Sequence, residues 1–337
     1  MSTRILRSHA QDKGSFTTAL ELCAIENPKL NITDEGGSIY RSKKWPQVQI
    51  EHVVELEDLT YQNIINAFEP LLTQPFNYDP TKIEAWKERA LEQAHVEDES
   101  TFVLYCEHWL IPMLRLIFHG IGYTYKIDLA IGDNGDQAGE VPVFRTWPGT
   151  INKEAKRPDF GSIYNIKEGK STRIWIAVAD AKLAVRWTWE DRHRRRKDLG
   201  LQKFLYPCRQ LAAYGVEAGT QYAIAVTSEE ACFTRLIDQG KASKPTSECP
   251  LSLKQIGVQG AAVKWSVSGK NRVTVLLGMV AWILSAMNED YRPIVSPGAQ
   301  TRLDEWVAIQ EGNETLYFNK ISQRTLRELP HGAIVLS

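Results

Sequence analysis

Apolar residues recur along the chain with two different spacings, and the change in spacing separates helices from strands. Spacing of three and four residues over 58–72, 80–95 and 98–119 predicts three helices. Asp79 and Pro80 stand where the N-cap and the first helical position of the second helix are expected. Pro112 is expected to bend the third helix.

Short runs rich in β-branched and aromatic residues predict strands in the second half of the chain. The predicted strands are 123–132, 140–147, 157–166, 173–184, 221–228, 231–237 and 261–269. The turn KEGKST between the runs 157–166 and 173–184 indicates a hairpin. A helix is predicted between about residue 200 and Gly215–Gly219, with Pro207 either inside it or at its true start. The apolar helix 271–288 is too short for a membrane span and is expected to be buried.

This order of helix, strands, helix and strand predicts an α/β fold with a central mixed β-sheet flanked by helices. We expect an accessory region at 1–97 that is largely helical, a core at 98–290, and an extension at 291–337 that packs on the core.

Composition limits the class of protein. The chain has 337 residues, 43% of them hydrophobic, which is enough for a sizeable core. Its formal net charge of −1 means that contact with nucleic acid would need a local basic patch. Residues 1–14 contain no apolar signal core, and no membrane association is expected. Five scattered cysteines without CxxC spacing favour a reducing compartment, nuclear or cytoplasmic, over a disulfide framework or a zinc site.

Charged residues lie at the ends of two predicted strands. Asp180 and Lys182 close the run 173–184, and side chains two residues apart on an extended chain point to one face. Asp159 lies near the start of the run 157–166. Carboxylate oxygens are ligands that Mg²⁺ and Mn²⁺ prefer, and such an ion assists phosphodiester hydrolysis. Asp159 and Asp180 are therefore candidate metal ligands, and Lys182 is a candidate to position the attacking water or stabilise the developing charge.

A glutamate on the preceding helix is a candidate third catalytic and metal-binding residue. Glu107 falls on the apolar stripe of helix 98–119, where a buried carboxylate without a partner would be costly. Glu99 is its rival. The alternative for Glu107 is a partly exposed helix edge and a pair with Arg115 or Lys126. The strand motifs have ordinary alternatives too, because most Asp-x-Lys triplets are surface ion pairs and Arg-Pro-Asp usually marks a turn.

Three further features are candidate contacts for nucleic acid. Gln210 and Tyr214 lie four residues apart and so share one helix face. The tryptophans Trp187 and Trp189 alternate with charge and could stack on bases. A basic run beside them supplies Arg192, Arg194, Arg195, Arg196 and Lys197. The alternatives are a polar helix edge, packing against the sheet edge, and a solvated loop or nuclear-import signal.

These residues together resemble the PD-(D/E)XK nuclease superfamily, which has the restriction-endonuclease-like fold. The matching pieces are Pro158-Asp159, the triplet 180–182, a preceding helix with an acid, and QLAAY at 210–214. The last piece resembles the Gln-x-x-x-Tyr element of the recombination-exonuclease branch. The stretch 206–236 and the apolar helix after it are similar to a group of fungal nuclease-like proteins. The resemblance covers about residues 98–290.

The resemblance implies a central four-stranded mixed sheet flanked by helices, with one or two Mg²⁺ or Mn²⁺ ions. It implies hydrolysis that leaves 5′-phosphate and 3′-hydroxyl ends. It also implies that Asp159 and Asp180 bind metal, that Lys182 is the catalytic lysine, and that Gln210 is the helix glutamine. Glu107 corresponds only loosely to the helix acid.

The sequence therefore predicts a divalent-metal-dependent nuclease, with DNA favoured over RNA as the polymer. A homodimer is compatible with this prediction, because restriction-type folds often pair to cut two strands. Two alternatives stay open. One is a catalytically silent protein of the same fold that binds nucleic acid or regulates it. The other is a toxin-like component of a selfish element.

Overall fold

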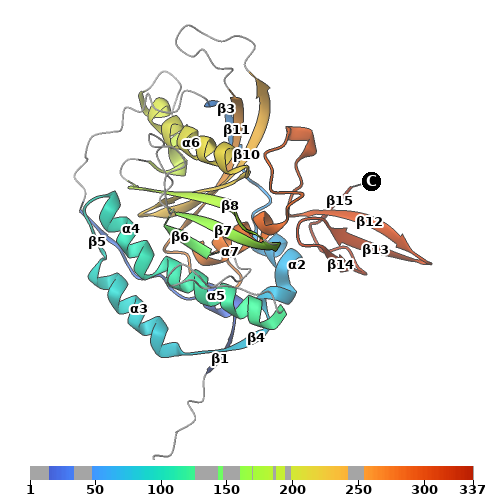
Figure 1. Ribbon diagram of the computed structural model, residues 1–337, viewed down its shortest axis with the longest axis horizontal. Coiled ribbons are helices and arrows are strands. Elements are labelled where there is room, and N and C mark those ends of the chain that lie inside the picture. The colour runs from blue at the N-terminus through green and yellow to red at the C-terminus, as the bar shows by residue number, and fades with distance from the viewer. Residues whose placement is uncertain are drawn as a thin grey trace, which may run out of the picture.

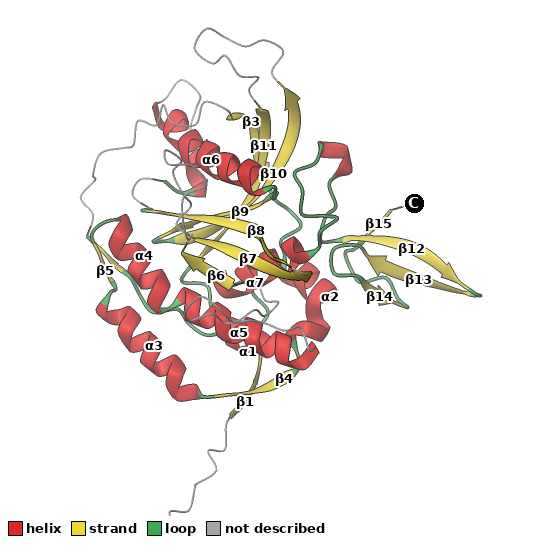
Figure 2. Ribbon diagram, in the orientation of Figure 1, coloured by secondary structure: helices red, strands yellow, loops and turns green. Residues whose placement is uncertain are grey.

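The computed structural model describes residues 15–33, 48–125, 143–146, 160–168, 170–184, 187–193, 199–241 and 254–336. A seven-stranded sheet lies at the centre, with helices on both faces (Figures 1 and 2). Its strands are β3 (Val48–Glu55), β6 (Val143–Thr146), β7 (Phe160–Glu168), β8 (Lys170–Lys182), β9 (Tyr222–Thr227), β10 (Glu230–Lys241) and β11 (Lys254–Lys264). They are ordered β3-β11-β10-β9-β8-β7-β6. The β8–β9 and β11–β3 pairs are parallel and the others antiparallel, so the predicted mixed α/β sheet is confirmed.

Helix α6 (Leu199–Ala218) covers one face of the sheet, and α5 (Leu110–Tyr125) and α7 (Val275–Met287) cover the other (Figure 1). Strand β8 serves both layers by alternation. Val178 packs in the apolar cluster under α6, whereas Ala177 and Ala179 pack in the cluster with α5 and α7. The two-residue period of the strand places Asp180 and Lys182 on the same face as Val178.

The predicted helix 98–119 is two helices, α4 (Glu99–His108) and α5, separated by Trp109. Pro112 explains why the break follows His108. Proline has no N–H to donate to the His108 carbonyl, and its ring crowds that oxygen. The combined run Glu99–Gly122 is apolar and long enough to cross a membrane by length and composition. It packs at the centre of the larger apolar cluster, as a core helix does.

The N-terminal region supplies helices α1 (Ala19–Cys23), α2 (Tyr61–Leu72) and α3 (Pro80–Glu92). Asp79 caps α3 as predicted, since its Oδ1 accepts a hydrogen bond from the Thr81 amide at 3.0 Å. The region also contains strands: the pair β1 (Ser15–Thr18) and β4 (Pro75–Tyr78), and the pair β2 (Asn31–Ile32) and β5 (His95–Val96). Strand β3 extends the central sheet, so part of the expected accessory region belongs to the core layer.

The C-terminal extension forms a second sheet, ordered β14-β13-β12-β15, that projects from the body (Figure 1). Its strands are β12 (Glu305–Glu311), β13 (Glu314–Asn319), β14 (Arg324–Leu326) and β15 (Ile334–Leu336). A 3₁₀ turn, η2 (Pro297–Ala299), precedes it. Arg324 ties the sheet to α2, because it donates to the backbone oxygens of Ile65 and Asn66 at 3.2 and 2.6 Å.

Several predicted boundaries move. Helix α5 continues to Tyr125, into the strand predicted at 123–132, and the rest of that strand lies outside the described residues. Strand β11 begins at Lys254 rather than at 261, because antiparallel pairing with β10 extends both strands into the predicted loop. Helix α6 runs through Pro207 without ending there.

Candidate active site at the end of strand β8

Asp180 and Lys182 lie at the end of β8, where it runs parallel to β9 and pairs Asp180 with Ala225 and Lys182 with Thr227. Their side chains meet, as the strand period predicts: the Lys182 ammonium forms an ion pair with Asp180 Oδ2. Asp180 is 2% exposed, while the Lys182 side chain keeps 14% of its surface exposed. Lys182 Nζ also donates to the Ala181 carbonyl at 2.7 Å. The pair therefore joins a buried carboxylate to a cation that reaches the surface.

The Asp180 carboxylate depends on one cation for compensation. Its Oδ2 is buried and makes no hydrogen bond with a described residue, so the ion pair with Lys182 is what compensates its charge there. A buried anionic oxygen of this kind is costly unless a cation is close. This oxygen fits the ligand role predicted for Asp180. Across the described residues, no group of three or more His, Cys, Asp or Glu side chains is placed to hold a metal ion.

Glu99 is the acid of α4 that reaches this pair. Its Oε2 lies 3.9 Å from Lys182 Nζ, and its side chain is 28% exposed. Glu107, the acid preferred from the sequence, is eight residues further along the helix, which amounts to about 12 Å of helical rise. Asp98 caps α4 by accepting from the Thr101 amide at 2.8 Å and so fixes the helix start that carries Glu99. The rival acid is thus the one within ion-pair distance of Lys182.

Asp159, the other predicted metal ligand, lies outside the described residues, as do Arg194, Arg195, Arg196 and Lys197. Phe160, the residue that follows Asp159, is described and is the cross-strand partner of Ala179.

The pair of Gln210 and Tyr214 shares one face of α6, and Gln210 Nε2 donates to Tyr214 Oη at 3.0 Å. Tyr214 is 2% exposed and belongs to the apolar cluster under α6. Its ring therefore packs inside the protein and its hydroxyl orients Gln210, which is half-buried. Of the two, Gln210 is the side chain with surface to offer a ligand.

Arg192 is committed to an internal contact, contrary to its prediction as a nucleic-acid contact. Its guanidinium lies 2.6 Å from Glu55 Oε2, donates to the Trp189 carbonyl at 3.0 Å, and stands 5.0 Å above the Trp189 ring. These partners leave 16% of the side chain exposed. The reason is that β3, which carries Glu55, is in the central sheet, a neighbour that no local pattern indicates.

The idea that Trp187 and Trp189 stack on bases is wrong, because each is 1% exposed. The alternative, packing beside the sheet, holds. Their indole N–H groups are satisfied internally: Trp187 Nε1 donates to the Phe204 carbonyl at 3.0 Å, and Trp189 Nε1 donates to Glu55 Oε2 at 3.2 Å. Burial of these two large aromatic rings is favourable, which accounts for their position inside the protein.

Sequence reasoning missed Glu230, at the turn between β9 and β10. Its Oε1 accepts from the Trp189 amide at 2.6 Å, and Ser228 Oγ of the same turn accepts from the Ala184 amide at 3.1 Å. Burial raises the pKa of Glu230, and the hydrogen bond from Trp189 partly offsets that. This turn thus holds the chain as it leaves β8. The signal was present as the polar stretch Thr227–Glu230, which directly follows the apolar residues 222–226 of β9.

The described site is therefore a buried carboxylate, an ammonium group in contact with it, and a second carboxylate at a helix start, all at one end of the sheet. The chain that leads away from it is held by hydrogen bonds that its Ala184 and Trp189 amides donate to Ser228 and Glu230. No protein-family model, curated protein or solved structure matches the chain.

Proposed function

We propose that the protein is a divalent-metal-dependent nuclease that hydrolyses phosphodiester bonds in nucleic acid, with DNA favoured over RNA. One observation carries the proposal: the buried Asp180 carboxylate has an oxygen without a hydrogen bond and touches the Lys182 ammonium. A protein core normally satisfies such an oxygen. Keeping a charged carboxylate buried costs free energy, so a pair of this kind at the end of a sheet is a candidate for a functional site.

The order of elements supports the resemblance to the PD-(D/E)XK superfamily. The hairpin β7–β8 is followed by helix α6 and then by β9, which returns parallel to β8. The expected four-stranded core corresponds to β6, β7, β8 and β9, and here β10, β11 and β3 widen the sheet to seven strands.

The residues divide the chemistry as follows. Asp180 and Asp159 would hold Mg²⁺ or Mn²⁺, and Glu99 takes the role of helix acid in preference to Glu107. A bound divalent cation supplies charge neutralisation and Lewis-acid activation at the phosphate. The Lys182 ammonium group is a hydrogen-bond donor. It therefore orients the attacking water and stabilises charge on the phosphate oxygens. Water adds at phosphorus as the bond to the 3′ oxygen breaks, which leaves 5′-phosphate and 3′-hydroxyl ends.

A second candidate function follows from the same ion pair. The ammonium of Lys182 already neutralises Asp180. A protein that binds nucleic acid without turnover would keep this pair closed and need no metal. The toxin-like alternative is not a different reaction. It would use the same nuclease activity, and it differs only in the biological role of that activity.

The two candidates separate in a cleavage assay. Purified protein is incubated with single- and double-stranded DNA and RNA in Mg²⁺, Mn²⁺ or EDTA, beside Lys182→Ala and the matched surface variant Lys82→Ala. The nuclease proposal expects product that disappears in EDTA and in Lys182→Ala but persists in Lys82→Ala. Binding that survives EDTA and Lys182→Ala, without product under any condition, would establish the silent protein instead.

A further inference from the structure

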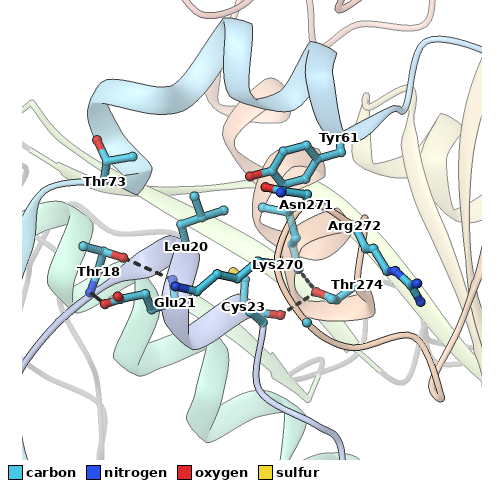
Figure 3. A pocket seen from close by; sticks show the side chains of 13 residues that line it. Thr18, Leu20, Glu21, Cys23, Tyr61, Thr73, Lys270, Asn271, Arg272 and Thr274 are labelled. Atoms are coloured by element: carbon cyan, nitrogen blue, oxygen red, sulfur yellow. Dashed lines mark hydrogen bonds between the residues drawn. The ribbon is translucent and has the colours of Figure 1, made fainter.

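A cavity of about 220 Å³ lies between α1, the start of α2 and the turn that leads into α7 (Figure 3). Three elements far apart in the sequence therefore form its wall. Figure 3 shows Tyr61, from the start of α2, and Lys270 and Arg272, from the turn before α7, among the side chains around it. Pockets for drug-sized ligands occupy about 300–1,000 Å³, so this cavity suits a smaller group.

The charges on the cavity wall favour an anion. Lys270 and Arg272 are both exposed, and neither forms an ion pair with a described residue. One carboxylate, Glu21, also lines the cavity. Its Oε2 is already used as an acceptor, from the Thr18 amide at 3.1 Å and from the Thr17 hydroxyl at 3.2 Å. Two cations without an ion pair to a described residue therefore line the cavity, and its one carboxylate is engaged in capping α1.

The cationic turn is held in place on a buried framework. Gly269 and Asn271 adopt positive φ values of 93° and 61°, so the chain turns sharply around Lys270. The Gly269 amide donates to the Ala24 carbonyl at 3.0 Å, and the buried Thr274 hydroxyl donates to the Cys23 carbonyl at 2.6 Å. Both bonds fasten the turn to the end of α1. The positive end of the α7 dipole at Thr274 adds to the field of the two side chains.

We propose that this cavity binds a phosphate monoester, with Lys270 and Arg272 as its charged contacts and Tyr61 beside the group that carries the phosphate. Guanidinium and ammonium groups are the usual partners of phosphate oxygens. The tyrosine ring offers an apolar surface for a sugar or base. Such a phosphate could come from a free nucleoside monophosphate or from the 5′ end of a nucleic-acid strand.

The test is calorimetric titration of the full chain in EDTA, with AMP and adenosine as probes. AMP should bind at least about tenfold more tightly than adenosine, because charge-assisted hydrogen bonds to the phosphate add to its affinity. The variant Lys270→Gln/Arg272→Gln should lose at least about tenfold in AMP affinity. The matched variant Lys82→Gln/Arg89→Gln removes the same net charge from exposed positions on α3 and should bind AMP like the wild type.

Further titrations identify the source of the phosphate and test the role of the Tyr61 ring. Tyr61→Leu should weaken AMP but leave the binding of inorganic phosphate unchanged. A 5′-phosphorylated oligonucleotide that binds more tightly than its 5′-hydroxyl counterpart assigns the site to strand ends, whereas AMP binding without this preference assigns it to free nucleotides. Equal affinity for AMP and adenosine, or unchanged AMP binding in Lys270→Gln/Arg272→Gln, would overturn the proposal. Asp180→Asn should bind AMP normally, so failure of the nuclease proposal leaves this one standing.

Discussion

Two buried carboxylates, Asp58 and Asp180, each pair with a cation, yet their surroundings differ. Asp58 Oδ2 accepts from Arg235 Nη2 at 2.9 Å and from the Leu303 amide at 2.7 Å, with both side chains of the pair 2–3% exposed. Asp180 Oδ2 touches the Lys182 ammonium but makes no hydrogen bond with a described residue.

The difference separates a framework contact from a candidate functional one. The Asp58 contact joins the entry to α2, strand β10 and the C-terminal extension, which are distant in the sequence. Asp180 and Lys182 are two residues apart on one strand, so their contact adds little to chain connectivity. A buried carboxylate whose cation stands on the same strand contributes little to holding distant segments together, and this is why we propose Asp180 rather than Asp58 as a ligand.

The largest effect is expected from breaking the framework pair. Arg235→Ala leaves the Asp58 carboxylate buried without its cation, which should lower the free energy of unfolding by about 3–5 kcal/mol. Urea denaturation measures it. Lys254→Ala is the control, since its partner Asp238 lies 3.4 Å away and both side chains are about one-third exposed. That variant should lose less than about 1 kcal/mol. Equal losses in the two variants would remove the distinction.

Asp180→Asn should lower activity strongly and stability only slightly, in contrast to Arg235→Ala. Cleavage should fall about a hundredfold or more, because the variant loses the proposed metal ligand and its charge. The free energy of unfolding should change by less than about 1 kcal/mol, since Lys182 can turn to solvent and to Glu99. The cleavage rate and the free energy of unfolding in urea, measured on the same sample, test both expectations. A variant that unfolds easily but still cleaves would show that Asp180 is a framework residue like Asp58.

Glu99→Gln and Glu107→Gln identify the helix acid. Glu99→Gln should weaken Mg²⁺ binding about tenfold, because Glu99 is the acid that contacts Lys182, whereas Glu107→Gln should leave it unchanged. Calorimetric titration with Mg²⁺ compares these two isosteric changes on one helix. The opposite ranking would restore Glu107 as the helix acid and make the Glu99 contact incidental.

The smallest effect is a pH dependence of stability from Asp58. Burial raises its pKa, but Arg235 and the Leu303 amide outweigh burial and hold the pKa below its ordinary value. The charged form therefore stabilises the protein above the unfolded-state pKa of about 3.9, by about 1.4 kcal/mol for each pKa unit. This contribution is lost as the pH falls through the folded-state pKa. The stability difference between wild type and Asp58→Asn should accordingly shrink on acidification, and a constant difference would contradict the argument.

Local sequence patterns were reliable where a local cause decides the structure. Asp79 and Pro80 begin α3 because capping involves only the next few residues. The meeting of Asp180 and Lys182 follows from the strand period alone. Patterns failed where a distant segment decides. Arg192, Trp187 and Trp189 look available in sequence, but β3 and α6 cover them with Glu55 and Phe204.

The sequence by itself determined which residues stand on β8 and on which side, because a strand allows only two directions for its side chains. Only the tertiary structure decided that Glu99 rather than Glu107 reaches Lys182, and that residues 48–55 join the central sheet. Those outcomes depend on where helices end and which strands become neighbours. Packing of the whole chain sets both, and no single segment carries the information.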